Sequence, residues 1–141
     1  MNGQEASGWL TVLILAGTFA TYFLKQIGRE YVKKLPGEYA GFADAYRRFM
    51  KSMIGKHRFF GTAALILLLV HSCPALVRST VSPSGLVAGL FLAASAGWGL
   101  YGFFCKRSLR SGWLPVHQTL AFLLLLAVVV HLFFKGPVAV K

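Results

Sequence analysis

The segment HRFFGTAALILLLVH, residues 57 to 71, begins and ends with histidine and is otherwise almost entirely apolar. A second segment, HQTLAFLLLLAVVVH, residues 117 to 131, has the same length and the same terminal histidines. Together the two segments hold all four histidines of the chain. Ionisable side chains are costly in membrane-spanning segments and are usually functional there. The two histidine pairs therefore decide how the rest of the sequence is interpreted.

The composition is typical of a membrane protein. Of the 141 residues, 56% are hydrophobic and only 13% are charged, and the mean hydropathy is +0.62. The net charge is +11, but the basic residues flank apolar runs. This placement favours anionic lipid headgroups over nucleic acid as their partner. We expect one domain over residues 1–141, a lipid bilayer around it and no nucleic-acid partner.

Four apolar runs are long enough to span a membrane. They cover residues 8–24, 57–77, 85–105 and 116–134. Most Lys and Arg residues lie in two connections, one after the first run and one after the third. The positive-inside rule then places both connections in the cytoplasm and both termini on the outer, periplasmic side of the cytoplasmic membrane. The sequence predicts an all-α, polytopic bundle of four transmembrane helices.

The first connection is also expected to contain an amphipathic cytoplasmic helix. After the Pro36-Gly37 break, apolar side chains recur at helical spacing, at Phe42, Tyr46, Phe49, Met50, Met53 and Ile54. We favour a helix that lies on the inner leaflet and anchors to lipid. The alternative is a docking surface for a cytoplasmic partner or a lid over a redox site.

Helical geometry places the histidines. Fourteen residues of helix rise about 21 Å, within a hydrocarbon core of about 30 Å, so each pair has one histidine near each membrane face. Fourteen residues are also two heptads, so both rings project from one stripe of the helix. Because the second and fourth runs cross in the same direction, His57 is expected level with His117 near the cytoplasmic face. His71 is expected level with His131 near the outer face.

Each predicted histidine pair suits a haem iron with two axial imidazoles. Imidazoles in direct contact would leave polar groups poorly satisfied in a membrane, and a zinc site needs its ligands closer together. The chain has no CxxCH sequence, so the haem is expected to be non-covalent. The spacing predicts two haem b groups, with the second nitrogen of each ring donating to a backbone carbonyl of the preceding turn.

Other residues are expected to surround the two haems. Gly61 and Ala121 follow a histidine by four residues, and Gly85 and Gly99 are again fourteen apart. These small residues leave room for a porphyrin, although the glycines of the third run fit a close helix contact equally well. The basic residues at haem level, which are candidates for pairing with the propionates, are Lys56, Arg58, Arg78 and Lys135.

Four spans with HX13H on both the second and the fourth resemble the haem-bearing bundle of respiratory cytochrome b. They are similar, more loosely, to ferric-reductase transmembrane domains and other small di-haem membrane cytochromes. The resemblance covers nearly all of residues 8–134. The resemblance implies transmembrane electron transfer by bis-histidine haems. The role of haem ligand is carried over only to His57, His71, His117 and His131. A quinone site would rest on the resemblance alone.

We therefore expect a relay of electrons between a quinol or cytoplasmic reductase and a periplasmic redox partner. No segment resembles the flavin or nucleotide domains of reductases, so these redox partners are expected to be separate proteins. One alternative is the membrane-anchoring cytochrome b subunit of a larger quinone-linked oxidoreductase of the respiratory chain. Another is a haem-free helical scaffold or a proton-conducting protein.

Overall fold

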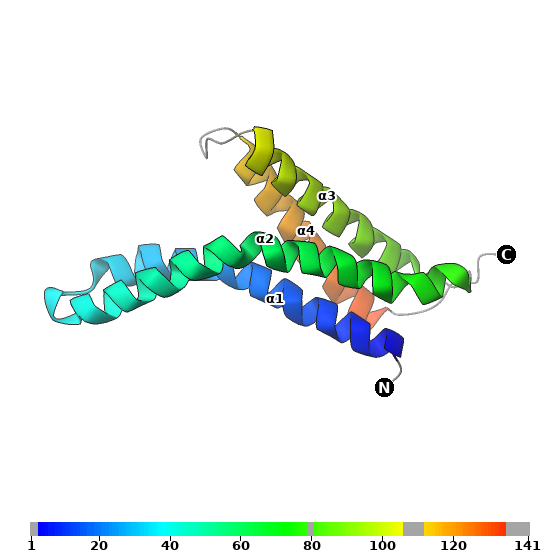
Figure 1. Cartoon of the computed structure of the whole chain (residues 1–141), viewed down its shortest axis with the longest axis horizontal. Helices are drawn as coiled ribbons and strands as arrows, with labels where there is room; N and C mark the ends of the chain where they lie inside the picture. Colours follow the sequence, from blue (N-terminus) through cyan, green and yellow to red (C-terminus); the bar gives the residue numbers. More distant parts are fainter. Residues whose placement is uncertain (1–2, 79–80, 106–111, 135–141) are drawn as a thin grey trace. The chain divides into compact units, whose positions relative to one another are not determined.

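The computed structural model describes residues 3–78, 81–105 and 112–134, and these residues lie in helices or short connections (Figure 1). The elements in order are α1 (Gly3–Glu30), η1 (Val32–Lys34), η2 (Gly37–Tyr39), α2 (Ala40–Val77), α3 (Pro83–Cys105) and α4 (Trp113–Phe133). The four α-helices are each long and apolar enough to cross a membrane. The predictions of an all-α chain and of four candidate spans are confirmed.

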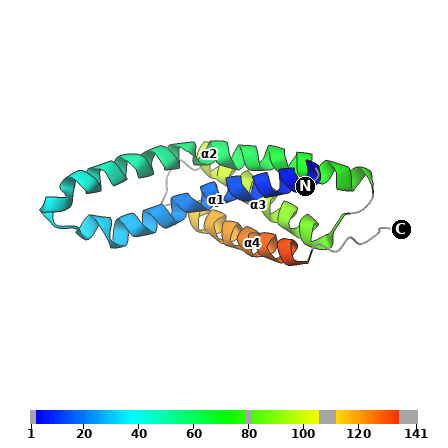
Figure 2. The ribbon, with the colours of Figure 1, turned by 90° about the horizontal axis from the view of Figure 1, so that it is seen from below.

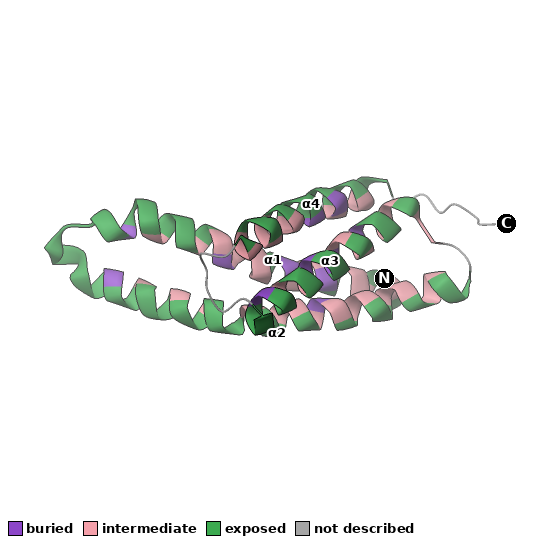
Figure 3. Cartoon of the chain, turned by 90° about the horizontal axis from the view of Figure 1, so that it is seen from above, coloured by how far each residue is buried: buried purple, intermediate pink, exposed green. Residues whose placement is uncertain are grey.

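Large apolar side chains are exposed along these helices (Figure 3). Leu69 of α2, Leu90 of α3 and Leu126 of α4 are 68%, 62% and 61% exposed. In water, apolar surface of this extent would drive association, whereas acyl chains solvate it readily. The exposed faces therefore indicate contact with a lipid bilayer.

Local sequence explains where α3 begins. Pro83 occupies its first position, where a missing N–H costs nothing and the fixed φ angle is already helical. The hydroxyl of Ser82 accepts a hydrogen bond from the backbone N–H of Gly85 at 3.1 Å, which caps the first turn. This cap matters for function because Ser82, Ser84 and Gly85 lie next to a histidine described below.

The amphipathic segment is not a separate helix. It forms the first half of α2, which runs unbroken for 38 residues, from Ala40 to Val77. Gly55 is the only weak helix former near the expected junction, and a single glycine costs a helix only about 1 kcal/mol. Figure 2 shows the chain passing from α1 through η1 and η2 into α2. A helix lying in the membrane plane would have to bend out of α2, and α2 has no break at this point.

Contacts within the chain define two compact units. One consists of Met1–Gly8 with Leu65–Lys141, and the other is Trp9–Ala64. The prediction of a single domain over residues 1–141 stays a prediction.

Helices α3 and α4 pack along their length in antiparallel register (Figure 1). Gly85 lies against His131 and Gly99 against His117, so equal steps along the two helices bring equivalent residues together. Midway between these contacts, Leu92 and Leu124 are 5% and 3% exposed. Small residues at the ends of the stripe and leucines at its centre let the two helices approach closely.

Candidate functional site

The rings of His71 and His131 lie together. Their ring centres are 6.3 Å apart, and the ring planes are inclined at 77°. Bonds from a metal ion to imidazole nitrogens are about 2 Å long, so two imidazoles on opposite sides of one ion have ring centres about 6 Å apart. An axial ligand can rotate about its bond to the ion, so nearly perpendicular rings are compatible with this arrangement. The spacing of the two rings fits one shared metal ion.

The Nδ1 atom of His71 is fixed by the start of α1. It lies 2.9 Å from the backbone carbonyl oxygen of Gln4. A carbonyl only accepts hydrogen bonds, so Nδ1 carries the proton and, in the neutral ring, Nε2 carries the lone pair. Gly8 makes the approach possible, because a methyl group at that position would lie 2.8 Å from His71 Cε1.

His117 repeats this arrangement against α3. Its Nδ1 atom donates to the backbone carbonyl of Ser95 at 2.9 Å. A methyl group at Gly99 would lie 3.1 Å from His117 Cε1. In both cases the accepting carbonyl lies four residues before the glycine. Within a helix that carbonyl bonds the glycine N–H, and its second lone pair takes the imidazole.

His57 meets a hydroxyl group instead of a carbonyl. Its Nδ1 atom is 3.3 Å from Thr21 Oγ1, within the unit formed by Trp9–Ala64. The Thr21 hydroxyl donates its proton to the carbonyl of Thr18 at 2.7 Å. Its oxygen can therefore only accept from His57, so Nδ1–H is the donor and Nε2 again carries the lone pair. Thr21 is 7% exposed, which protects this bond from water.

His131 is held by two serines. Its Nδ1 atom lies 3.2 Å from Ser84 Oγ and 3.4 Å from Ser82 Oγ. Ser84 donates its own proton to the carbonyl of Phe134 at 3.1 Å, whereas Ser82 accepts from the Gly85 N–H and has a proton to donate to Nδ1. His57, His71 and His117 thus share the tautomer with a protonated Nδ1, and the contacts of His131 are compatible with either tautomer.

The protonated Nδ1 is the arrangement expected of histidines that bind a metal through Nε2, because the bond made by Nδ1 orients the ring and raises its basicity. One detail of the sequence prediction is wrong. The acceptors are not carbonyls of the preceding turn of the same helix, because α1 supplies them for α2 and the segment around α3 supplies them for α4.

Each histidine stripe has a buried small or aliphatic residue at its centre. Ala64 is midway between His57 and His71 and is 0% exposed, and Leu124 is midway between His117 and His131. The two histidines of each helix are therefore separated by a tightly packed position.

The predicted pairing of His57 with His117 stays a prediction, because the two residues belong to different units. Gly85 and Gly99, predicted as neighbours of a porphyrin, have imidazole atoms of His131 and His117 close by. A methyl group at Gly61 would meet no atom within 4 Å, and Ala121 is half-buried on α4.

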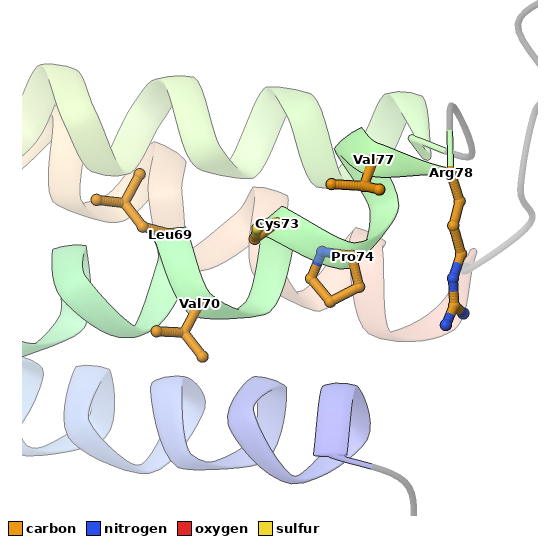
Figure 4. Close-up of a pocket in the computed structure, with 6 residues that line it drawn as sticks. All are labelled: Leu69, Val70, Cys73, Pro74, Val77 and Arg78. Atoms are coloured by element: carbon orange, nitrogen blue, oxygen red, sulfur yellow. The ribbon is translucent and has the colours of Figure 1, made fainter.

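The basic candidates are less closely tied to the histidines. The guanidinium of Arg58 lies 5.0 Å from the centre of the Phe59 ring. Arg78 follows the last residue of α2 and lines an open groove of about 610 Å³ (Figure 4). The other residues that line this groove are Leu69, Val70, Cys73, Pro74 and Val77. Lys56 is exposed, and Lys135 lies outside the described residues. Their pairing with propionates stays a prediction.

A conventional metal site is not found in the described part of the chain. Among those residues, no group of three or more His, Cys, Asp or Glu side chains is placed to hold an ion. Two imidazoles suffice only when the ion brings its other ligands with it, as haem iron does.

Comparison with known proteins gave no match: no family model fits the sequence, and no curated protein or solved structure aligns with it at a significant level.

The sequence reasoning missed the residues that orient the histidines, which are Gln4, Gly8, Thr21, Ser82, Ser84 and Ser95. A signal for some of them was present. Thr21 and Ser95 are polar residues within apolar helices, and each is buried. Gln4 and Ser95 stand four residues before a glycine that faces a histidine.

Proposed function

We propose that the chain is a transmembrane electron-transfer protein that holds two b-type haems, one between His57 and His117 and one between His71 and His131. The observations that carry this proposal are the contact between the rings of His71 and His131 and the common tautomer of three of the four histidines. In His57, His71 and His117, Nδ1 donates to a defined acceptor, which leaves Nε2 with the lone pair that an iron ligand needs. A histidine buried for structural reasons alone has no need to share one tautomer with two others.

The proposed site depends on what the protein's own residues do. The acceptors orient the imidazole planes and, in His57, His71 and His117, hold a proton at Nδ1. Haem held by the four histidines would supply a one-electron carrier.

The membrane orientation is part of the proposal. The basic connections would face the cytoplasm and both termini the periplasm, since Lys and Arg are retained on the cytoplasmic side. The cytoplasmic membrane would then separate a donor, such as a quinol or a reductase, from a redox partner on the other side. Membership of a larger quinone-linked oxidoreductase fits the same site, with this chain as its cytochrome b subunit.

A reduced-minus-oxidised spectrum of the purified chain tests the cofactor. We expect a b-type band and two haems per chain, measured as haem stoichiometry on protein from haem-replete cells. Correctly folded, purely helical protein that lacks this band would leave the haem-free scaffold or proton-conducting protein as the better reading.

Single histidine variants test the pairing. His71→Ala and His131→Ala are expected to lose the same haem, and His57→Ala and His117→Ala the other one, because one missing axial ligand empties a bis-histidine site. Circular dichroism and gel filtration show whether each variant folds, and Gly55→Ala is the matched control on α2, because no atom lies within 4 Å of its added methyl group. Loss of one and the same haem in His57→Ala and His71→Ala would show that the level-by-level pairing is wrong.

A further inference from the structure

The connection between α1 and α2 reaches well beyond the hydrocarbon. Residues 6–24 of α1 and residues 59–77 of α2 contain no Asp, Glu, Lys or Arg. Each uncharged stretch of helix is about 28 Å long, close to the hydrocarbon thickness of about 30 Å. Residues 25–58, which we call the arm, are therefore left outside. Its α2 part alone, residues 40–58, extends for about another 28 Å.

Part of the apolar face of the arm is used within the protein. The Tyr46 hydroxyl donates to the carbonyl of Leu24 at 2.6 Å. A methyl group at Gly28 would lie 3.3 Å from Tyr46 Cε1 and 3.5 Å from Met50 Sδ. The arm is thus a packed helical hairpin, in which Phe42 and Phe49 remain 59% and 54% exposed. The lipid anchoring favoured from the sequence stays a prediction.

The opposite face of α2 in the arm is basic. Residues spaced three, four and seven apart share one side of a helix, and on this side they are Asp44, Arg47, Arg48, Lys51 and Arg58. All five are exposed. Arg47 pairs with Asp44, an exposed ion pair that leaves the face with a clear excess of positive charge. We call these five residues the basic face.

The basic face leads toward one of the proposed iron ligands. Arg58 is the immediate neighbour of His57, and Arg48 lies nine residues earlier, about 14 Å along the helix. His57 itself is bonded to Thr21 within the same unit as the arm. A protein bound to the basic face would therefore lie close to the cytoplasmic histidine level.

We propose that the basic face is the docking surface for a soluble electron-carrier protein with an acidic surface. The identity of the partner rests on the proposed function, whereas the binding follows from the arm itself. Opposite potentials steer two proteins together and raise the association rate. A second copy of this chain is disfavoured, because it would bring one basic face against another.

Binding can be measured without relying on haem. The full chain is placed in nanodiscs of zwitterionic phosphatidylcholine, and a small acidic [2Fe–2S] ferredoxin is the probe in surface plasmon resonance. Arg48→Gln/Lys51→Gln is expected to slow association about tenfold at low salt and to flatten its salt dependence. The control, Lys33→Gln/Lys34→Gln, removes the same charge from exposed residues of η1. Equal losses in the two variants, or no ferredoxin binding at low salt, would overturn the proposal.

Anionic lipid is tested separately. In Phe49→Trp protein, the emission of the introduced indole is compared in phosphatidylcholine nanodiscs and in nanodiscs containing phosphatidylglycerol. We expect no blue shift, because the arm stands away from the bilayer. A blue shift in phosphatidylglycerol, with ferredoxin binding lost there, would show that the arm lies on lipid and would overturn the docking proposal. Absence of haem would remove the proposed function but would leave the difference between the two glutamine variants unchanged.

Discussion

The helix pairs α1–α2 and α3–α4 differ in how they hold the imidazole rings of their histidines. Near one end, each pair sets a glycine against a histidine, Gly8 against His71 and Gly85 against His131. Near the other end they differ. His117 lies over Gly99 and reaches a main-chain carbonyl, whereas His57 meets the side chain of Thr21. A glycine on the neighbouring helix therefore gives the ring of His117 access to a main-chain carbonyl. The ring of His57 instead contacts a side-chain oxygen of its neighbouring helix.

The pairs differ also beyond the spans. The connection between α3 and α4 covers residues 106–112, whereas α1 and α2 both continue past their uncharged stretches to form the arm. Both connections are rich in basic residues, but one spans only seven residues and the other is part of a packed hairpin. The two helix pairs therefore differ in the length of their helices and not in the charge of their connections.

The largest effect is expected where α3 and α4 are closest. A methyl group at Gly102 would overlap the indole ring of Trp113, so Gly102→Ala should destabilise the protein by about 2 kcal/mol through overpacking. Reversible unfolding in mixed micelles measures this. Gly97→Ala is the matched control on α3, because nothing lies within 4 Å of its added methyl group. It should be neutral or stabilising by up to about 1 kcal/mol, and equal effects would contradict the close contact.

A second set of variants compares the glycines that face the histidines. The added methyl group would lie 2.8 Å from His71 Cε1 in Gly8→Ala and 3.1 Å from His117 Cε1 in Gly99→Ala. We expect Gly8→Ala to weaken retention of its haem about tenfold or more and Gly99→Ala to have a smaller effect, because a displaced ring loses its fixed acceptor. Haem content after dilution measures both. Gly17→Ala, with no atom within 4 Å, should retain normal content.

A third test concerns the arm, which only α1–α2 possesses. Tyr46→Phe removes the hydrogen bond to the Leu24 carbonyl and should cost about 1 kcal/mol of local stability. Faster amide exchange in residues 25–58, with unchanged exchange in α3 and α4, is the expected readout. Tyr39→Phe, at a position 51% exposed, serves as the control. Unaltered exchange in Tyr46→Phe would argue that the arm is not held by this contact.

The smallest effect is expected at the hydroxyl acceptor. Thr21→Val keeps the shape of the side chain and removes the oxygen that accepts from His57. The ring becomes a weaker electron donor, so the midpoint potential of the haem proposed at His57 should rise slightly while that of the other proposed haem stays constant. Potentiometric titration followed by visible spectroscopy measures both. Thr62→Val on exposed α2 surface is the control, and a shift of the wrong haem would exclude the assigned contact.

The sequence predicts the helices and the histidine stripes because both depend on local periodicity. Uncharged runs of membrane length indicate α1 to α4, and the spacing of fourteen indicates which residues share a face. The continuity of α2 through residues 40–58 is harder to predict. The helical spacing there predicts a separate amphipathic helix, whereas its joining to the second span depends on Tyr46 and Met50 packing against α1.

The hydrogen-bond acceptors of the imidazoles could not be predicted from the sequence, because they too depend on tertiary packing. Which carbonyl or hydroxyl reaches an Nδ1 atom depends on the register between two helices, and that register is a tertiary property. Gln4 illustrates the limit, because it acts on His71 through its main chain and any other residue could supply the same oxygen. In the sequence of this segment, Gly8 is the residue whose type reflects the close approach of His71.

The division between carbonyl and hydroxyl acceptors also bears on how such a protein is adjusted over time. The Nδ1 atoms of His71 and His117 bond main-chain carbonyl oxygens, which no point mutation can remove. Those of His57 and His131 contact the side-chain hydroxyls of Thr21 and Ser84, which a single substitution can remove. In the proposed pairing, each haem would have one histidine bonded to a main-chain carbonyl and one in contact with a side-chain hydroxyl. Evolution, or an engineer, can then retune either half of the relay without dismantling it.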